Sequence, residues 1–289
     1  MKDIIIAGST GYLGRHLVAA LQSKNLPFRA ITRNTQNLMD AGLPPSRIIT
    51  AQVTQPQTLS EQLNGAELLI STVGITRQKD GLTYMDVDYQ ANLNLLREAQ
   101  KAGIRKMIYV SAINGQHLRH LKIMEAKERF VDALISSGMD YIIIRPNGFF
   151  SDMADFLAMA KKGTVYLFGH GQYKLNPIHG ADLAEMILDS RDLTNSQIEV
   201  GGPDILTQDE IAKLALDAFR TQGKVIHLPD WTRRAFIWLA RTFTSSKTYG
   251  PLEFFLTMMA QDNIGPRYGV HRLETFFERE AEVMRTVRT

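Results

Sequence analysis

Short apolar runs alternate along the first half of the chain with stretches whose apolar residues recur at helical spacing. Aliphatic and β-branched residues dominate these runs, as expected of strands covered on both faces of a sheet. The intervening helical patterns include 12–23, a short helix from Pro56, 85–102 and 121–137. Strands are predicted at 3–7, 28–32, 47–51, 67–72, 106–111 and 141–145. Strands joined by crossover helices indicate an α/β fold with a doubly wound parallel sheet.

The alternation loosens after Phe149. Thr207-x-x-Glu210 marks a helix start, and helical segments near the C-terminus are predicted to break at Gly250-Pro251 and Gly265-Pro266. Other elements are predicted at 164–168, 181–189, 197–200 and 224–228. We therefore expect one domain over 1–150, with 176–200 as a segment that could return to it. A smaller, mostly helical C-terminal lobe is expected over 151–289.

Composition narrows the class of protein. The 289 residues are 44% hydrophobic and 22% charged, as in soluble globular proteins. The formal net charge of +3 is too small for an electrostatic nucleic-acid binder, so no nucleic-acid partner is expected. The absence of cysteine excludes disulfides and thiolate chemistry, and no metal is expected. A first strand that starts near Asp3 leaves no room for a signal peptide, and no apolar run is long enough to span a bilayer. We expect a cytoplasmic protein.

A glycine-rich loop joins the first predicted strand to the first predicted helix. Its sequence, GSTGYLG, has the spacing G-x-x-G-x-x-G, a relative of the dinucleotide fingerprint. Glycine permits a tight turn and lets backbone N–H groups approach a pyrophosphate, while the helix directs its positive end at the phosphates. A glycine-rich turn without a ligand is the alternative, but the strand before and the helix after it favour binding. The predicted contacts are Gly8, Ser9, Thr10, Gly11, Tyr12, Leu13 and Gly14.

The end of the second strand indicates which dinucleotide is bound. The fingerprint predicts an acidic residue about 20 positions on, which binds the ribose 2′-hydroxyl. Here Arg33 follows the strand, and no Asp or Glu is near it. A guanidinium pairs with a 2′-phosphate, which a carboxylate would repel. The alternative is a solvated loop arginine. The sequence therefore predicts NADP(H).

Several segments together resemble an atypical short-chain dehydrogenase/reductase of the NmrA-like and isoflavone-reductase-like branch. They are the glycine loop, Arg33, STVG (71–74), VDYQANLNLLREA (87–99), YVSA (109–112), RPNGFFSDM (145–153) and NPIHGADLA (176–184). The resemblance covers 1–190 and implies a Rossmann fold with strand order 3-2-1-4-5-6 and a C-terminal lobe that shapes the substrate pocket. It also implies cofactor contacts from Gln52, Val53, Thr72, Val73, Gly74, Ser111, Lys127, Pro146, Asn147, Gly148 and Phe149. Gln52 would bind adenine where the family usually has an Asp.

The catalytic pattern departs from this family. Typical members carry Tyr-x-x-x-Lys on the helix after the fifth strand, where the lysine lowers the tyrosine pKa. Lys127 fits the lysine position, but Ile123 stands where the tyrosine would be. The resemblance implies that Lys127 binds the nicotinamide ribose and donates the proton, with a pKa lowered by a partly apolar pocket. The alternative is a solvated lysine paired with Glu125 or Glu128. Ser111 is either a second catalytic residue or the cap of a strand end.

Other segments offer weaker candidates. His117 and His120 are interpreted as a substrate-side loop, and Asp182 as the cap of the next helix. For the aromatic and basic stretch 231–243, with 254–259, a helix buried between the lobes is favoured, and an apolar substrate pocket comes second. A dimer face or a membrane surface are further alternatives.

Two hypotheses of function follow. The first is an NADPH-dependent reductase that transfers hydride to a carbonyl or activated alkene, without the usual tyrosine. Its substrate is expected to be a small apolar molecule. The protein is expected to be a monomer or a homodimer, and a membrane is not expected as a partner. The alternative is a non-catalytic NADP(H)-binding redox sensor or assembly protein, which needs the glycine loop but no proton donor.

Overall fold

The computed structural model describes residues 3–76, 81–220 and 222–286. The chain folds into two compact units. The first comprises Met1–Arg145 and Leu183–Ile198, and the second Pro146–Asp182 and Glu199–Thr289. Each unit has its own hydrophobic core and is described by itself below.

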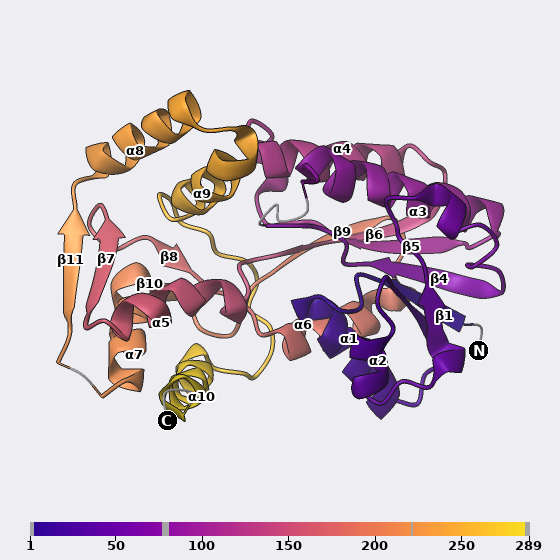
Figure 1. Ribbon diagram of the computed structural model, residues 1–289, viewed down its shortest axis with the longest axis horizontal. Coiled ribbons are helices and arrows are strands. Elements are labelled where there is room, and N and C mark those ends of the chain that lie inside the picture. Colours follow the sequence, from indigo (N-terminus) through magenta and orange to yellow (C-terminus); the bar gives the residue numbers. More distant parts are fainter. Residues whose placement is uncertain (1–2, 77–80, 221, 287–289) are drawn as a thin grey trace. The chain divides into compact units, whose positions relative to one another are not determined.

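Within the described residues, seven strands of the chain form one sheet. Its order is β3-β2-β1-β4-β5-β6-β9 (Figure 1), and every registered pair from β3 through β6 is parallel. The strands are β1 (Asp3–Ala7), β2 (Phe28–Thr32), β3 (Ile48–Thr50), β4 (Ala66–Ser71), β5 (Lys106–Val110), β6 (Asp140–Pro146) and β9 (Ser196–Val200). The order reverses between β1 and β4, and open α/β sheets bind ligands at the carboxyl ends of the strands beside such a switch point. The predicted fold class and strand order are confirmed, and β9 adds a strand beside β6.

Helices of the first unit connect these strands. They are α1 (Tyr12–Ser23), α2 (Gln36–Asp40), the π-helix η3 (Met85–Ala91), α3 (Asn92–Lys101), α4 (Lys122–Ile135) and most of α6 (Gly180–Asp189). Short 3₁₀ turns are η1 (Pro45–Arg47), η2 (Pro56–Thr58), η4 (Gly115–His117) and η6 (Ser190–Asp192). The core between sheet and helices includes Ile5, Leu69, Tyr109 and Phe130. The long helix predicted over 85–102 is found without a break, but its first seven residues, Met85–Ala91, are π-helical and not α-helical.

The second unit combines short strand pairs with helices. β7 (Thr164–Phe168) pairs in parallel with β11 (Lys224–Leu228), and β8 (Lys174–Leu175) pairs antiparallel with β10 (Leu206–Thr207). The helices are η5 (Phe150–Met153), α5 (Ala154–Ala160), α7 (Gln208–Ala218), α8 (Asp230–Phe243), α9 (Ser246–Met258) and α10 (Leu273–Thr286). Phe156, Ile211 and Phe277 are among its core residues. The predicted capping box at the start of α7 is confirmed.

The predicted break at Gly250-Pro251 is wrong, because both residues lie inside α9. Proline disfavours helical backbone at the preceding residue through a clash with that residue's Cβ. Gly250 has no Cβ, so this clash does not arise, and what remains is the lost hydrogen bond of the proline nitrogen and the crowding of its ring against the preceding turn. Burial of Glu253 and Leu256 then anchors the rest of the helix.

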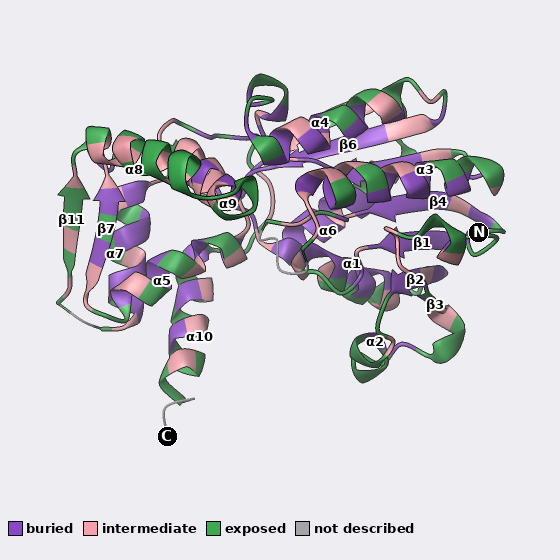
Figure 2. Ribbon diagram, turned by 45° about the horizontal axis from the view of Figure 1, so that its top comes forward, coloured by how far each residue is buried: buried purple, intermediate pink, exposed green. Residues whose placement is uncertain are grey.

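The expectation of a buried helix over 231–243 is also wrong. None of the residues of α8, all of which are described, is buried. Figure 2 accordingly colours this helix as exposed and intermediate along its whole length. Over the part of the chain that the structure describes, no helix combines the length and apolarity needed to cross a bilayer.

Candidate nucleotide and catalytic site

The glycine loop between β1 and α1 is shaped for a ligand to approach its backbone. Gly8 adopts a left-handed φ of +85°, and a Cβ on Gly14 would overlap the Gly8 carbonyl oxygen. The Ser9 hydroxyl donates to the Ile31 carbonyl at 2.7 Å and fixes the loop to β2. Gly11 caps α1 without a side-chain hydrogen bond, and the first turn of the helix carries no acid. This helix terminus therefore presents N–H groups and positive potential, which suit a pyrophosphate.

The loop after β4 lies directly against the glycine loop. The Thr72 hydroxyl lies 3.2 Å from the Ala7 carbonyl oxygen and 3.3 Å from that of Gly8. Buried Asn92 holds the loop from below, because its amide accepts from Ser71 Oγ (2.6 Å) and donates to the Val73 carbonyl (3.1 Å). The predicted cofactor residues Thr72, Val73 and Gly74 are thus brought beside Gly8.

The same asparagine explains the π-helix. Asn92 Nδ2 also contacts the carbonyl oxygens of Asp88 (2.9 Å) and Val87 (3.3 Å). A side chain inserted among helix carbonyls disturbs the regular ladder, and π-turns of this kind are frequent at functional sites. The π-helix carries Asp88, a residue that our sequence reasoning did not select as a site residue.

Lys127 of α4 forms an ion pair with Asp88. Lys127 Nζ lies 2.8 Å from Asp88 Oδ1, the carboxylate is fully buried, and the lysine side chain is 12% exposed. The Ile75 N–H donates to the other carboxylate oxygen at 3.2 Å. A Cβ on Gly74 would lie 2.7 Å from Asp88 Oδ1 and 2.9 Å from Lys127 Nζ, so the loop passes close to the charged ends of the pair. The ammonium is therefore held against the predicted cofactor loop.

The alternative pairing of Lys127 with Glu125 or Glu128 is not found. Glu125 pairs with Lys122 at 2.9 Å, and Glu128 pairs with Arg145. Burial by itself lowers the pKa of Lys127, but the charge of Asp88 and its hydrogen bond raise it, and the net direction is upward. The lowered pKa expected from an apolar pocket is therefore not found, and the ammonium stays charged at neutral pH.

Ser111, at the end of β5, belongs to a buried charge cluster. Its hydroxyl donates to Glu128 Oε1 at 2.8 Å. Arg145 on β6 makes a bidentate pair with the same carboxylate, at 2.5 Å and 2.8 Å. All three side chains are buried. The hydroxyl thus satisfies an ion pair that would otherwise be costly to bury, and its catalytic role stays a prediction.

The residues predicted to bind the adenosine half follow the carboxyl ends of β2 and β3. Arg33 is exposed directly after β2. The Gln52 amide nitrogen donates to Thr54 Oγ1 at 3.0 Å, so this contact uses the nitrogen and not the oxygen of the amide. The Val53 carbonyl accepts from Asn94 Nδ2 at 3.0 Å. Their contacts with a cofactor stay predictions.

The predicted segment 146–149 lies in the second unit, where Asn147 is a structural centre. Its amide nitrogen donates to Asn176 Oδ1 (2.8 Å) and to the Asn263 carbonyl (2.6 Å). Its amide oxygen accepts from the Gly148 N–H at 2.8 Å. This buried side chain is fully occupied inside the unit, so a cofactor contact from Pro146, Asn147, Gly148 or Phe149 stays a prediction.

Contacts within the second unit settle the expectation for Asp182. Asp182 lies inside α6 and accepts from the backbone N–H groups of Val270 (3.1 Å) and His271 (3.0 Å), so its predicted helix cap is wrong. Its other carboxylate oxygen lies 2.7 Å from His271 Nδ1. Among the described residues, no group of three His, Asp or Glu side chains is placed to hold a metal ion.

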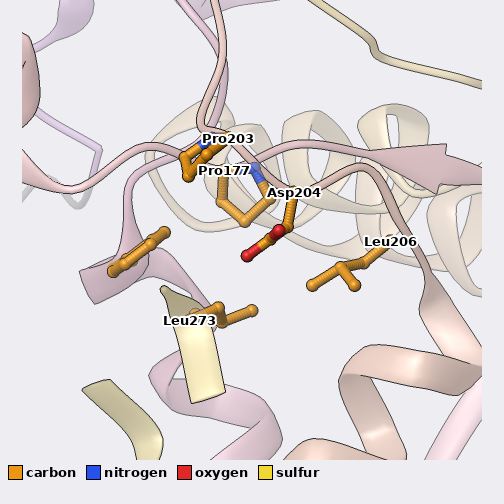
Figure 3. A pocket seen from close by; sticks show the side chains of 6 residues that line it. Pro177, Pro203, Asp204, Leu206 and Leu273 are labelled. Carbon is orange, nitrogen blue, oxygen red and sulfur yellow. The ribbon is translucent and has the colours of Figure 1, made fainter. Parts of the chain in front are cut away.

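A shallow hollow of ≈ 150 Å³, a volume that includes space open to solvent, lies within the second unit (Figure 3). It is lined by Phe150, Pro177, Pro203, Asp204, Leu206 and Leu273. Pockets for small organic ligands usually hold at least about 300 Å³. This hollow is therefore too small for a dinucleotide, and the glycine loop of the first unit is the better candidate.

The switch-point sheet and the glycine loop define a Rossmann-type nucleotide-binding protein. The chain belongs to the NAD(P)H-binding family, whose model matches residues 8–192. Its resemblance to the NmrA-like, atypical short-chain dehydrogenases is confirmed at this level.

Comparison with known proteins gives both enzymes and an assembly factor. The chain is 26% identical to a chloroplastic divinyl chlorophyllide a 8-vinyl-reductase of Zea mays, over 96% of this chain and 78% of the relative. It is 27% identical to the photosystem II assembly factor Ycf39 of Synechocystis, over 50% and 44%. An NADPH-dependent quinone oxidoreductase of Escherichia coli, solved with NADPH, has a similar fold, with a TM-score of 0.68, 16% identity and coverage of 97% and 99%.

Proposed function

We propose that the protein is an NADPH-dependent reductase that transfers hydride to an apolar carbonyl or activated alkene. The observation that carries this proposal is the Lys127 ammonium, which Asp88 holds against Gly74 beside the glycine loop. A charged, nearly buried lysine at the carboxyl ends of the strands can bind the cofactor ribose and also supply a proton, and the second role is needed only for reduction. The vinyl reductases among the relatives favour an alkene acceptor.

NADPH, when bound, supplies the hydride. In this chain, the glycine loop and the α1 terminus would hold the pyrophosphate, and Arg33 would hold the 2′-phosphate. Lys127 would bind the ribose and place an N–H near the acceptor atom that gains negative charge. There the ammonium stabilises that charge and provides the proton. Asp88 keeps the ammonium charged and in place.

A second candidate function is a non-catalytic NADP(H)-responsive sensor or assembly protein. Ile123 favours it, because the helix lacks the tyrosine donor of typical members. The likeness to Ycf39 supports it too. A cytoplasmic location and a monomeric or homodimeric state are parts of the proposal that await measurement.

The test is NADPH oxidation, followed by absorbance, with a panel of enones, quinones and aldehydes. Turnover is expected with at least one acceptor, and Lys127→Met should lower kcat by about 10²–10⁴-fold, the usual contribution of a positioned proton donor. NADPH binding, measured by cofactor fluorescence, should persist in this variant. Lys122→Met is the matched control, because Lys122 lies on the same helix but is half-exposed and pairs with Glu125.

The outcomes separate the two functions. Intact NADPH binding without turnover on any acceptor would favour the sensor. Turnover that survives Lys127→Met unchanged would remove Lys127 from the mechanism. Asp88→Asn should lower kcat more than it raises the KM for NADPH, and it should shift the pH dependence of kcat, because the ammonium loses its counter-charge.

A further inference from the structure

Helix α8 exposes large apolar side chains instead of burying them. The exposed fractions are 68% for Trp231, 49% for Phe236, 63% for Trp238, 44% for Leu239 and 76% for Phe243. A helix that covers a core buries one apolar stripe and turns its polar face to water. A group of exposed apolar side chains on one helix commonly marks an interaction site.

The exposed apolar residues of α8 lie on one side of the helix, where Thr232 and Thr242 are interspersed among them. At 100° per residue, Trp238, Trp231, Leu239, Phe243 and Phe236 fall in that order around the helix, within about half of its circumference. Arg234 and Arg241 lie one above the other along one edge of this face, and Arg233 lies beyond the other edge. Half-buried Ile237 and Ala240 occupy the remaining side, and α9 packs against α8.

The charge around this face has one sign. From Trp231 to Leu252 the sequence contains four basic residues, Arg233, Arg234, Arg241 and Lys247, and no acidic residue. Asp230 pairs with Arg233 (2.7 Å) and Arg234 (3.0 Å), and Glu253 pairs with Arg241, so two carboxylates face four cations. The net charge of the whole chain is only +3, so much of its excess is gathered on this helical hairpin.

We propose that α8 is an interfacial helix that docks the protein onto an anionic lipid bilayer surface. A helix with Trp, Phe and Leu on one face and arginines at its edges can lie in the headgroup plane, with its apolar side chains inserted. Tryptophan favours this interfacial layer, arginine side chains extend to the headgroups, and anionic lipids attract the local positive charge. A second copy fits less well, because a symmetric pair of α8 faces would set arginines against arginines.

The tryptophans provide a direct measurement. The chain contains two, Trp231 and Trp238, and both lie on the proposed face, so tryptophan fluorescence, excited where tyrosine does not absorb, reports on α8 alone. The full-length protein is titrated with vesicles of equal parts phosphatidylcholine and phosphatidylglycerol, and with vesicles of phosphatidylcholine. We expect a blue shift and co-sedimentation with the anionic vesicles, weaker binding to the neutral ones, and reversal by high salt.

Variants that keep both tryptophans test the face. Phe236→Ser/Phe243→Ser should weaken binding to the anionic vesicles at least about tenfold, given the apolar surface that it removes. Arg234→Glu should abolish the preference for phosphatidylglycerol. Leu193→Ser/Val270→Ser is the matched control, because these residues are also exposed (49% and 78%) but lie elsewhere. Circular dichroism and thermal unfolding confirm that each variant is folded.

Several results would overturn the proposal. One is equal binding to neutral and anionic vesicles, and another is no binding to either. A blue shift that grows with protein concentration in the absence of vesicles would assign the face to a second copy. A blue shift produced only by an apolar acceptor would assign it to the substrate. The proposal is independent of the reductase function, so Lys127→Met should bind vesicles as the unmodified protein does.

Discussion

Single residues determine which charged groups the candidate site can hold. Gly74 leaves room for Lys127 Nζ and Asp88 Oδ1 to meet at 2.8 Å. A buried carboxylate without a counter-charge is costly, and a lysine without one would tend to lose its proton. The pair therefore keeps an ammonium charged in nearly buried surroundings. Arg33, in contrast to Lys127, is exposed. Its contribution to binding therefore depends on the anion that the cofactor presents to it.

Replacement of Arg33 by alanine tests the cofactor preference. An arginine–phosphate contact is a charge-assisted pair of hydrogen bonds, worth about 1.5–3 kcal/mol, so NADPH should bind about ten- to a hundredfold more weakly. NADH binding should be nearly unchanged. Arg105→Ala is the control, because Arg105 is exposed at the start of β5, at the opposite end of the parallel strands. An equal loss for NADH and NADPH would show that Arg33 does not bind the 2′-phosphate.

The residues of the site differ in how far the sequence alone could predict them. The glycine loop and Lys127 can be predicted because each lies in a short sequence motif, and the residues of that motif act together at the site. Asp88 is an ordinary acidic residue in a helical pattern, and its partner lies on another helix. Only the packing of α4 against the π-helix makes it the counter-charge of Lys127. A buried π-turn has no residue spacing of its own, so Met85–Ala91 looked like ordinary helix.

The start of a helix can be predicted from a few residues where their side chains form hydrogen bonds with nearby backbone groups. Thr207 and Glu210 satisfy each other's backbone N–H groups at the start of α7, at 2.7 Å and 3.2 Å. Such a cap can be predicted from four residues, here Thr207-x-x-Glu210. The continuation of α9 through Pro251 could not, because it depends on the missing Cβ of Gly250 and on burial further along the helix.

The capping box gives a prediction about pH. Hydrogen bonds from the Thr207 backbone N–H and hydroxyl hold the pKa of Glu210 below its ordinary value. A depressed carboxyl pKa adds stability above its unfolded-state value, which is lost as the pH falls through the folded-state pKa. Glu210→Gln should therefore destabilise the protein at neutral pH, by about 1 kcal/mol or less. Thermal unfolding should show this difference shrinking as the pH falls below 4. Glu278→Gln, which replaces an exposed glutamate of α10, is the matched control.

At the scale of the molecule, the predicted cofactor residues are divided between two units. The glycine loop, Arg33, the loop after β4 and Lys127 all belong to the first unit, and 146–149 belongs to the second. A Rossmann sheet places the carboxyl ends of its strands along one edge, which explains why so many of these residues could be predicted from strand ends alone. What the second unit contributes to cofactor binding is a separate question, because Asn147 already serves its own unit.

Hydrogen exchange with and without NADPH answers that question. A ligand at about 100 times its Kd stabilises the folded state by about 2.7 kcal/mol, so the most protected amides should exchange about a hundredfold more slowly. Peptides from 8–14 and 72–74 should show additional local protection, and those from 146–149 should follow if that segment binds the cofactor as predicted. Peptides from α8, which carries no predicted cofactor residue, provide the internal control. Local protection confined to the first unit would mean that 146–149 does not hold the cofactor, and that the first unit binds it alone.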